Sequence, residues 1–121
     1  MVARTATGRA LRRLLPADAD LWVPEHFYAE VGSVVRRWAH TDALTESEAS
    51  AALARLVAWP LHRTQLRSMI TGAWAHRHNI TFADALYVSL AEHLRATMLT
   101  GDHKLANGPT LPVPVLHLST P

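Results

Sequence analysis

Hydrophobic residues along the chain fall into helical stripes separated by short unbroken apolar runs. A helical spacing of apolar residues over 4–15, with arginines on the opposite side, predicts a first helix that a proline ends. The run LWVP at 21–24 is typical of a buried strand. The apolar residues from Phe27 to Trp38 then lie on one stripe, which predicts a second helix beginning at Pro24.

Capping residues mark the next helices. Thr45 followed by Glu48 has the spacing of a capping box and predicts the start of a third helix. A fourth helix is expected over 64–78. A fifth, apolar on most of its circumference, is expected from Thr81 to about Arg95.

Two apolar runs near the end of the chain predict further strands. They are ATMLT at 96–100 and VPVLHL at 113–118, with a loop between them at 108–112. Helices between short apolar strands indicate an α/β domain with a short, mostly parallel sheet. Such sheets usually have about four to six strands, and only three are predicted here. We therefore expect a single domain over 1–121 whose first strand is absent at the N-terminal end.

Composition narrows the class of protein. Hydrophobic residues make up 49% of the 121 positions and charged residues 18%, which suits a folded domain with a sizeable core. The chain has no cysteine, which excludes disulfides and thiolate zinc sites. No apolar run reaches the roughly 18 residues of a membrane helix, and no secretion signal is recognised. A cytoplasmic location without membrane contact is expected.

The basic residues are almost all arginine. The formal net charge is +2, and Lys104 is the single lysine among twelve basic residues. Arginine binds phosphate through a planar fork of donors, so an RNA or DNA partner is possible. An Ala/Arg-rich composition that reflects a GC-rich genome explains the same numbers equally well. The arginines that would serve a helical nucleic-acid binder are Arg9, Arg12, Arg13, Arg36 and Arg37.

Two acidic residues stand out against apolar helices. Glu30 lies at the edge of the second helix's stripe, with Ser33 and Val34 one turn on, so no lysine or arginine is in register there. A half-exposed glutamate at the margin of the core is the simpler interpretation. Asp84 lies in the first turn of a helix that should be largely buried, where a carboxylate needs a partner. Thr81 offers one through a capping box, and a metal ion is the alternative.

A third carboxylate, Asp102, follows the strand at 96–100. It is either the N-cap of a short helix or a ligand-binding residue at a strand end. Strand ends and helix starts meet at one edge of such a fold, where three carboxylates would repel one another without a cation. Oxygen ligands suit Mg²⁺ or Mn²⁺, the ions used in phosphodiester cleavage. Lys104 could contact a phosphate there, although a solvated loop is the simpler account.

Two stretches resemble a known family. LWVPEHFYAEV resembles a segment of PIN-domain ribonucleases in which a proline precedes a glutamate by six residues. ITFADALYVSLAEHLRATMLTGDHKLA resembles their most diagnostic stretch, which ends in a strand followed by Leu-Thr-x-Asp. The similarity covers roughly residues 8 to 118 and is strongest to the short VapC-type toxins of bacterial toxin–antitoxin pairs.

The resemblance implies a three-layer PIN-like fold and a metal-dependent endoribonuclease. Glu30, Asp84 and Asp102 would be the catalytic acids that bind Mg²⁺ or Mn²⁺, with Thr100 and Lys104 supporting the site or the substrate. The resemblance also implies an RNA substrate, a small antitoxin partner and a homodimer.

One departure bears on activity. Family members begin with a strand whose aspartate completes the acidic cluster, and both that strand and that aspartate are expected to be missing here. An active ribonuclease, an inactive remnant that binds an antitoxin or RNA, and an unrelated arginine-rich binder all remain open.

Overall fold

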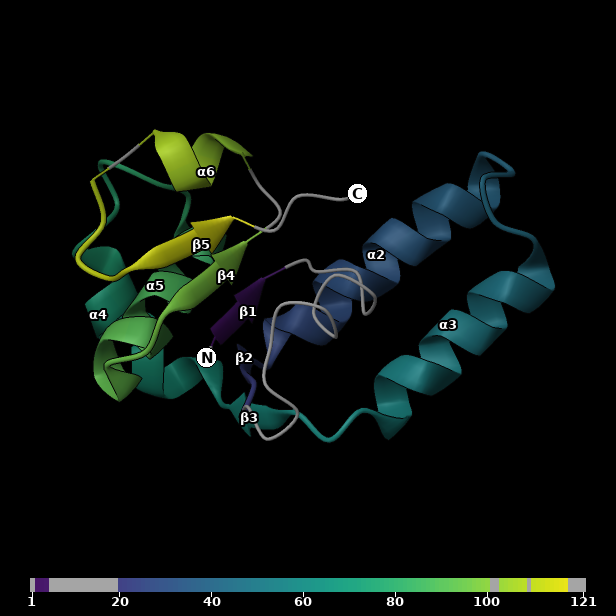
Figure 1. The fold of residues 1–121 in the computed structure, drawn as a ribbon, viewed down its shortest axis with the longest axis horizontal. Coiled ribbons are helices and arrows are strands. Elements are labelled where there is room, and N and C mark those ends of the chain that lie inside the picture. Colours follow the sequence, from purple (N-terminus) through teal and green to yellow (C-terminus); the bar gives the residue numbers. More distant parts are fainter. Residues whose placement is uncertain (1, 5–19, 101–102, 109, 118–121) are drawn as a thin grey trace. The chain divides into compact units, whose positions relative to one another are not determined.

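The computed structural model describes residues 2–4, 20–100, 103–108 and 110–117 (Figure 1). The predicted helix over 4–15 falls almost entirely outside these residues. In chain order the elements are β1 Val2–Arg4, β2 Trp22–Pro24, α2 His26–His40, α3 Glu46–Ala58, β3 His62–Thr64, a 3₁₀ turn η1 at Leu66–Met69, α4 Ile70–Trp74, α5 Phe82–Leu94, β4 Met98–Thr100, α6 His103–Asn107 and β5 Val115–His117.

The strands form one parallel sheet in the order β3-β2-β1-β4-β5. Helices between parallel strands confirm the predicted α/β class. The expectation that the first strand is absent is wrong, because β1 is the central strand and pairs Val2 with both Trp22 and Met98. The sequence analysis missed this strand because its three residues are followed directly by the arginine-rich segment, whose pattern favoured a helix.

The edge strand β3 was also missed. Its residues His62 and Arg63 are exposed and polar, so they carry no apolar run from which a strand could be predicted. The fourth helix is correspondingly shorter than expected. In place of one helix over 64–78, the structure has β3, η1 and then α4, which ends at Trp74.

Helix α5 forms the centre of the core. Its seven consecutive residues Ala85–Ala91 are buried, and it packs against β1, β2 and β4. The side chains of Met98 and Leu99 in β4 are fully buried as well. Thr81 caps the start of the helix, as predicted, and Arg95 ends it in the left-handed conformation with φ of 52°. The buried circumference explains why this helix shows little amphipathic pattern.

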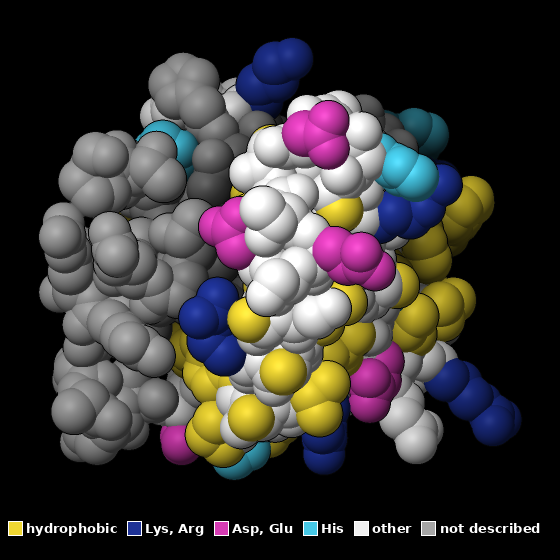
Figure 2. Space-filling model, turned by 90° about the vertical axis from the view of Figure 1, so that its right-hand side faces the viewer, with side chains coloured by type: hydrophobic (Ala, Val, Ile, Leu, Met, Phe, Trp, Pro, Cys, Tyr) yellow, Lys and Arg dark blue, Asp and Glu magenta, His cyan; other side chains and the backbone are white. Residues whose placement is uncertain are grey.

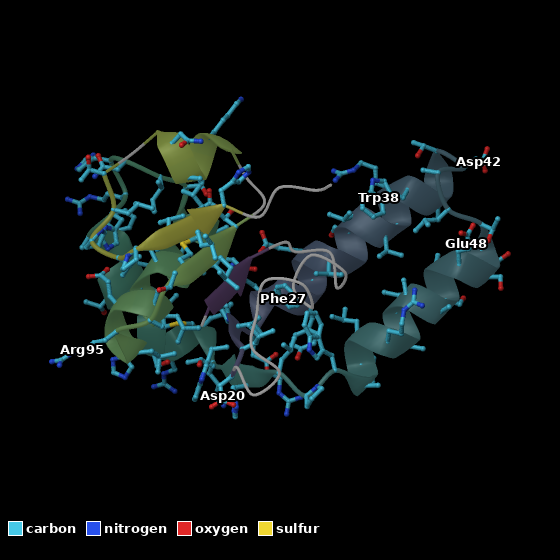
Figure 3. The ribbon with its side chains drawn as sticks, viewed as in Figure 1. Asp20, Phe27, Trp38, Asp42, Glu48 and Arg95 are labelled. Atoms are coloured by element: carbon cyan, nitrogen blue, oxygen red, sulfur yellow. The ribbon has the colours of Figure 1, made fainter. Side chains whose placement is uncertain are left out.

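Helices α2 and α3 pack on each other as a hairpin (Figures 1 and 3). Asp42, in the turn between them, has a φ of 60°. The predicted capping box at the start of α3 is confirmed: Glu48 N–H donates to Thr45 Oγ1 at 3.1 Å, and Thr45 N–H donates to Glu48 Oε1 at 3.0 Å. Most of α3 is exposed, and Ala49 is its buried residue.

The chain divides into two compact units, which we describe separately. The first comprises Met1–Pro24 and Leu61–Pro121 and contains the sheet, and the second is Glu25–Pro60. The single domain expected from the sequence stays a prediction. Within the described part of the chain, no helix combines the length and the apolar character needed to span a membrane.

Candidate active site

The carboxyl ends of the parallel strands define one edge of the sheet in the first unit. β1 ends at Arg4, β4 at Thr100 and β5 at His117, and the register pairs the Cα of Thr100 with those of both Arg4 and His117. Because the strands are parallel, the chain leaves all of them at the same edge. Ligands bind at this edge in open α/β sheets, and the sequence analysis expected the acidic residues to lie there.

The central strand brings an arginine to this edge. Its sequence is Val-Ala-Arg, and no Asp or Glu precedes Asp18 in the chain. The resemblance implies an aspartate in this strand, so the strand is present and its acid is not. The sequence analysis missed both Arg4 and His117 as edge residues, because neither belongs to a motif and only the sheet register reveals their positions.

Asp84 lies at the start of α5. The helix leads directly back into β4, so its first turn faces the edge where β4 ends. The side chain is half-buried, and the seven residues after it are buried. A carboxylate in the first turn is stabilised by the positive end of the helix dipole. Its role as a site residue stays a prediction.

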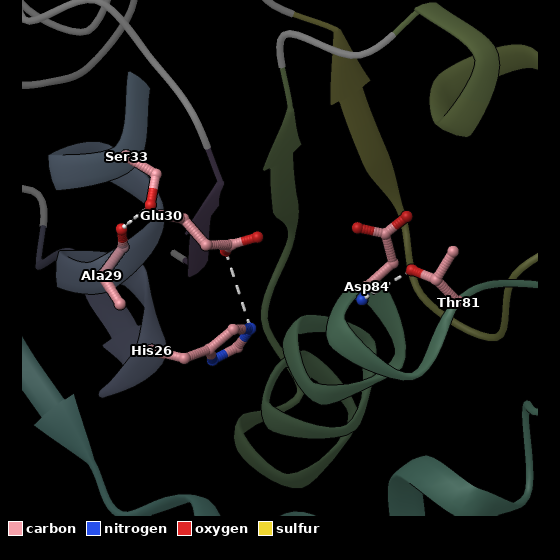
Figure 4. A network of polar contacts seen from close by, with 6 residues as sticks. All are labelled: His26, Ala29, Glu30, Ser33, Thr81 and Asp84. Atoms are coloured by element: carbon pink, nitrogen blue, oxygen red, sulfur yellow. Dashed lines mark hydrogen bonds and ion pairs between the residues drawn. The ribbon is translucent and has the colours of Figure 1, made fainter. Parts of the chain in front are cut away.

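The cap of α5 is only half of a capping box. Asp84 N–H donates to Thr81 Oγ1 at 3.2 Å (Figure 4). Between these two described residues, the reciprocal bond from Thr81 N–H to the Asp84 carboxylate is not formed, unlike the bond at Thr45. Asp is one methylene shorter than the Glu or Gln of a capping box. The cap that the structure shows at this helix start is therefore the bond from the Asp84 backbone N–H to the Thr81 hydroxyl.

The end of β4 carries the other predicted residues. Thr100 is its last residue and has no exposed surface. Asp102 lies outside the described residues, so its role as a ligand stays a prediction. The short helix expected after it is present as α6, on which Lys104 is exposed.

Glu30 belongs to the second unit and is described within it. It lies on α2 with 31% of its side chain exposed, and its Oε1 is 3.6 Å from Nε2 of His26 (Figure 4). The sequence analysis looked for partners only on the C-terminal side of Glu30 and missed this one, although His26 precedes it by one helical turn.

The donor set suits a hard divalent cation. Asp84 and Glu30 offer carboxylate oxygens at half-buried positions, and oxygen is the ligand that Mg²⁺ and Mn²⁺ prefer. Within residues 2–4, 20–100, 103–108 and 110–117, no three His, Asp or Glu side chains lie close enough together to hold an ion. A complete ligand set would therefore require Asp102, which is not among them.

The chain is similar to a group of curated proteins. It is 39% identical over 106 residues to Ribonuclease VapC3 of Mycobacterium tuberculosis, a match that covers 88% of this chain and 77% of the relative. It is also 39% identical over 113 residues to Ribonuclease VapC1 of the same organism, covering 93% and 84%. Ribonuclease VapC12 is 28% identical over 106 residues, covering 88% and 81%.

The fold and a family model agree with these similarities. A solved structure described as a toxin–antitoxin complex from Klebsiella pneumoniae superposes with a TM-score of 0.64 at 16% identity, over 98% of this chain and 97% of that one, which supports the fold. The family model described as PIN domain matches residues 1–109. The chain is therefore a member of the PIN domain family, of the VapC type.

Proposed function

We propose that this protein is a VapC-type toxin that cleaves RNA phosphodiester bonds with the help of a divalent metal ion. The observation that carries the proposal is the 39% identity, over most of the chain, to two relatives that are named ribonucleases. The position of Asp84 supports it, because this half-buried carboxylate lies in the first turn of α5.

In this proposal Asp84, Asp102 and Glu30 hold Mg²⁺ or Mn²⁺. Such an ion activates a water molecule and neutralises charge on the scissile phosphate. Asp84 lies in the first turn of α5, where the positive end of the helix dipole favours a negatively charged side chain. Thr100 is the buried last residue of β4 and stabilises the sheet edge at which the ion would bind. The exposed Lys104 attracts the phosphate backbone of the substrate.

The test is cleavage of RNA by the purified full chain in the presence and absence of Mg²⁺ or Mn²⁺. Asp84→Asn and Asp102→Asn should each abolish metal-dependent cleavage. Glu48→Gln is the matched control, because it alters a carboxylate at an equivalent helix position whose oxygen is already bound to Thr45. Cleavage that survives both aspartate substitutions, or that needs no metal, would overturn the proposed site.

A substitution at Arg4 distinguishes an active enzyme from an inactive remnant. β1 ends at Arg4, where the resemblance implies an aspartate, and a basic residue at this position supplies no oxygen ligand for a metal ion. We expect Arg4→Asp to tighten Mn²⁺ binding and to raise the cleavage rate. If the natural chain does not cleave and Arg4→Asp does, the natural protein is a non-catalytic member that binds an antitoxin or RNA.

An arginine-dependent nucleic-acid binder is the other function left open by the sequence. Arg36 and Arg37 are exposed on α2, whereas Arg9, Arg12 and Arg13 lie outside the described residues. Binding through arginines alone would weaken steeply with salt and would not need a metal. RNA binding measured over a range of KCl concentrations, with and without Mn²⁺, separates this function from metal-dependent cleavage.

We further propose a small antitoxin as protein partner, a homodimer as the assembly and the cytoplasm as the location. Trp38, Leu53 and Val57 expose 45%, 40% and 83% of their surface on the helical hairpin. Figure 2 shows hydrophobic side chains among carboxylates on the side of the molecule that it displays. Exposed apolar surface of this kind favours contact with another protein chain. Light scattering of the chain alone and with its antitoxin would establish the two assemblies.

A further inference from the structure

An open hollow lies between α4 and the start of α5, two helices that pack side by side in the first unit (Figure 1). Its volume is about 390 Å³, and it is lined by Ile70, Thr71, Trp74 and Phe82. Trp74 exposes 58% of its surface and Phe82 38%, so two large aromatic side chains border the hollow and face solvent. Exposed apolar surface around a hollow indicates a binding site.

The two aromatic rings are held in a defined arrangement. The centroids of the Trp74 and Phe82 rings are 6.4 Å apart, and their planes meet at 60°. A Cβ atom at Gly72 would lie 2.5 Å from Oγ of Ser89, so glycine at this position lets α4 pack closely on α5. Fixed aromatic rings are the surfaces on which bases stack in proteins that bind single-stranded nucleic acids.

A cation lies beside the aromatic rings. Cζ of Arg77 is 5.0 Å from the centroid of the Trp74 ring, and Nη1–H of Arg77 donates to the Trp74 carbonyl at 3.0 Å. Arg77 does not line the hollow, so the hollow borders on another part of the indole. In the part of the chain that the structure describes, no carboxylate forms an ion pair with Arg77. Its guanidinium therefore brings a net positive charge to the rim of the hollow.

The charge of the surrounding segment favours one kind of occupant. Residues 62–83 contain no aspartate or glutamate, and the three arginines among them, Arg63, Arg67 and Arg77, are exposed. A second copy of this chain, related by a two-fold axis through the hollow, would bring equal positive charges together, which disfavours self-association there. RNA carries the opposite charge on its backbone and, where it is single-stranded, offers unpaired bases to aromatic rings.

The size of the hollow favours the same occupant. Its volume of about 390 Å³ lies in the range of small-ligand sites, which suits one planar base better than a protein segment. Phe82 precedes Asp84 by two residues in the first turn of α5, so their side chains leave the helix about 200° apart. A base in the hollow would thus belong to a nucleotide beside the cleaved bond, and not to the nucleotide at the metal ion.

We propose that the hollow formed by Ile70, Thr71, Trp74 and Phe82 is a stacking site for one unpaired base of a single-stranded RNA, and that Arg77 binds a neighbouring phosphate. The inference rests on the proposed function, in which this RNA is the substrate. The aromatic rings supply affinity for the base, and the arginine supplies affinity for the backbone. The site therefore selects single-stranded over double-stranded RNA.

The experiment measures binding of a short fluorescent oligouridine to the full chain by anisotropy, in EDTA so that metal-dependent cleavage does not interfere. Trp74→Ala and Phe82→Ala should each weaken binding about tenfold or more, the usual loss for a base that no longer stacks on a ring. Trp74→Tyr keeps a ring and should restore most of the affinity. Leu116→Ala is the control, because this exposed side chain belongs to the same unit and does not line the hollow.

Two further comparisons separate stacking from charge. Arg77→Gln should reduce the salt dependence of binding, because it removes one contact to a phosphate. The natural chain should bind single-stranded RNA about tenfold more tightly than a duplex of the same length, in which the bases are paired with each other. Equal affinity for the two RNAs would overturn the inference.

A measurement on the natural chain keeps the test valid if a variant folds poorly. Oligouridine should shift the indole N–H NMR signal of Trp74, whereas an abasic strand of the same length, which has the same phosphates, should not. If the abasic strand binds as tightly as oligouridine, the stacking site is wrong.

Other outcomes distinguish an RNA site from a protein-docking surface. If Trp74→Ala leaves RNA affinity unchanged and changes the oligomeric state in light scattering, the hollow binds protein and the inference is wrong. If Asp84-dependent RNA cleavage persists in that case, the proposed function stands. RNA binding that depends on Trp74, in a natural chain that does not cleave RNA, would instead refute the proposed function and support the inference.

Discussion

Helices α3 and α5 begin alike and are used differently. Both have 13 residues, a threonine N-cap and an acidic residue three positions on. In α3 the Glu48 carboxylate accepts the Thr45 N–H, and Ala49 is the one buried residue. In α5 the Asp84 carboxylate does not close the cap, and the seven residues that follow it are buried.

The difference shows that the same spacing of threonine and acidic residue can give a closed capping box in one helix and half of one in another. A glutamate at the third helical position reaches back to the N-cap, and this commits its oxygen to the helix. An aspartate at that position is one methylene shorter, and in α5 the cap consists of the bond from Asp84 N–H to the Thr81 hydroxyl. The identity of the acid, rather than its spacing, separates the two helix starts.

The largest difference between the two helices should appear in RNA cleavage, when the carboxylates of Asp84 and Glu48 are replaced one at a time. Asp84→Asn should lower metal-dependent RNA cleavage at least about a hundredfold, because losing a charged ligand costs several kcal/mol of charge stabilisation. Glu48→Gln should leave the cleavage rate unchanged. Initial rates at saturating metal, with circular dichroism as a check on folding, provide the measurement. Equal losses in both variants would mean that the two helix starts do not differ in function.

The two helices should differ strongly in their contribution to stability. Leu90 in α5 is 1% exposed and Leu53 in α3 is 40% exposed. Leu90→Ala should lower the free energy of unfolding by about 2–5 kcal/mol, as expected for a core cavity. Leu53→Ala should lower it by less than about 1 kcal/mol. Urea denaturation of the three proteins tests this order, and a larger loss at Leu53 would contradict the burial that the structure assigns to α5.

Double-mutant cycles would sharpen the comparison of the caps. Thr45→Ala and Thr81→Ala should each cost about 1 kcal/mol, the usual effect of losing an N-cap hydroxyl. Combining Thr45→Ala with Glu48→Ala should give a measurable favourable coupling, because the two residues exchange two hydrogen bonds that alanine removes. The corresponding cycle for Thr81 and Asp84→Asn should give a smaller coupling. Equal couplings would show that both boxes close in solution.

The smallest expected effect is a pH dependence confined to α3. The hydrogen bond from the Thr45 backbone, and secondly its side chain, lower the pKa of Glu48 below the ordinary value of 4.5. A carboxyl with a lowered folded pKa contributes stability above pH 4.5, and this is lost as pH falls through the folded pKa. NMR titration of the Glu48 side chain measures the shift directly. In Thr45→Ala the pKa should move back toward 4.5.

Sequence patterns predicted most of this fold where residues are strongly apolar or capped. β2, β4 and β5 lie within predicted runs, and Thr45 and Thr81 are the N-caps of their helices. The strands β1 and β3 were missed because each contains an arginine and neither belongs to a longer apolar run. Whether a short segment forms a strand depends on the strands that it pairs with. The sequence pattern of the segment alone does not show those strands.

The candidate site was predictable to the extent that its residues belong to motifs. Asp84 and Glu30 were named in this way, and they lie in the first turn of α5 and in the second turn of α2; their roles stay predictions. His26 was missed although its spacing from Glu30 is a helical one, because the search considered only one direction along the chain. Arg4 was missed because its position follows from pairing with Thr100, which is distant in sequence.

The central position of β1 has a consequence for how the protein is made. Val2 emerges early from the ribosome, but its partner Met98 is synthesised much later. Contacts between segments so distant in sequence form slowly, and the middle of the sheet cannot close before β4 is available. The edge that carries Thr100 is therefore assembled only after β4 has been synthesised. A nascent chain interrupted before that point would lack the site altogether.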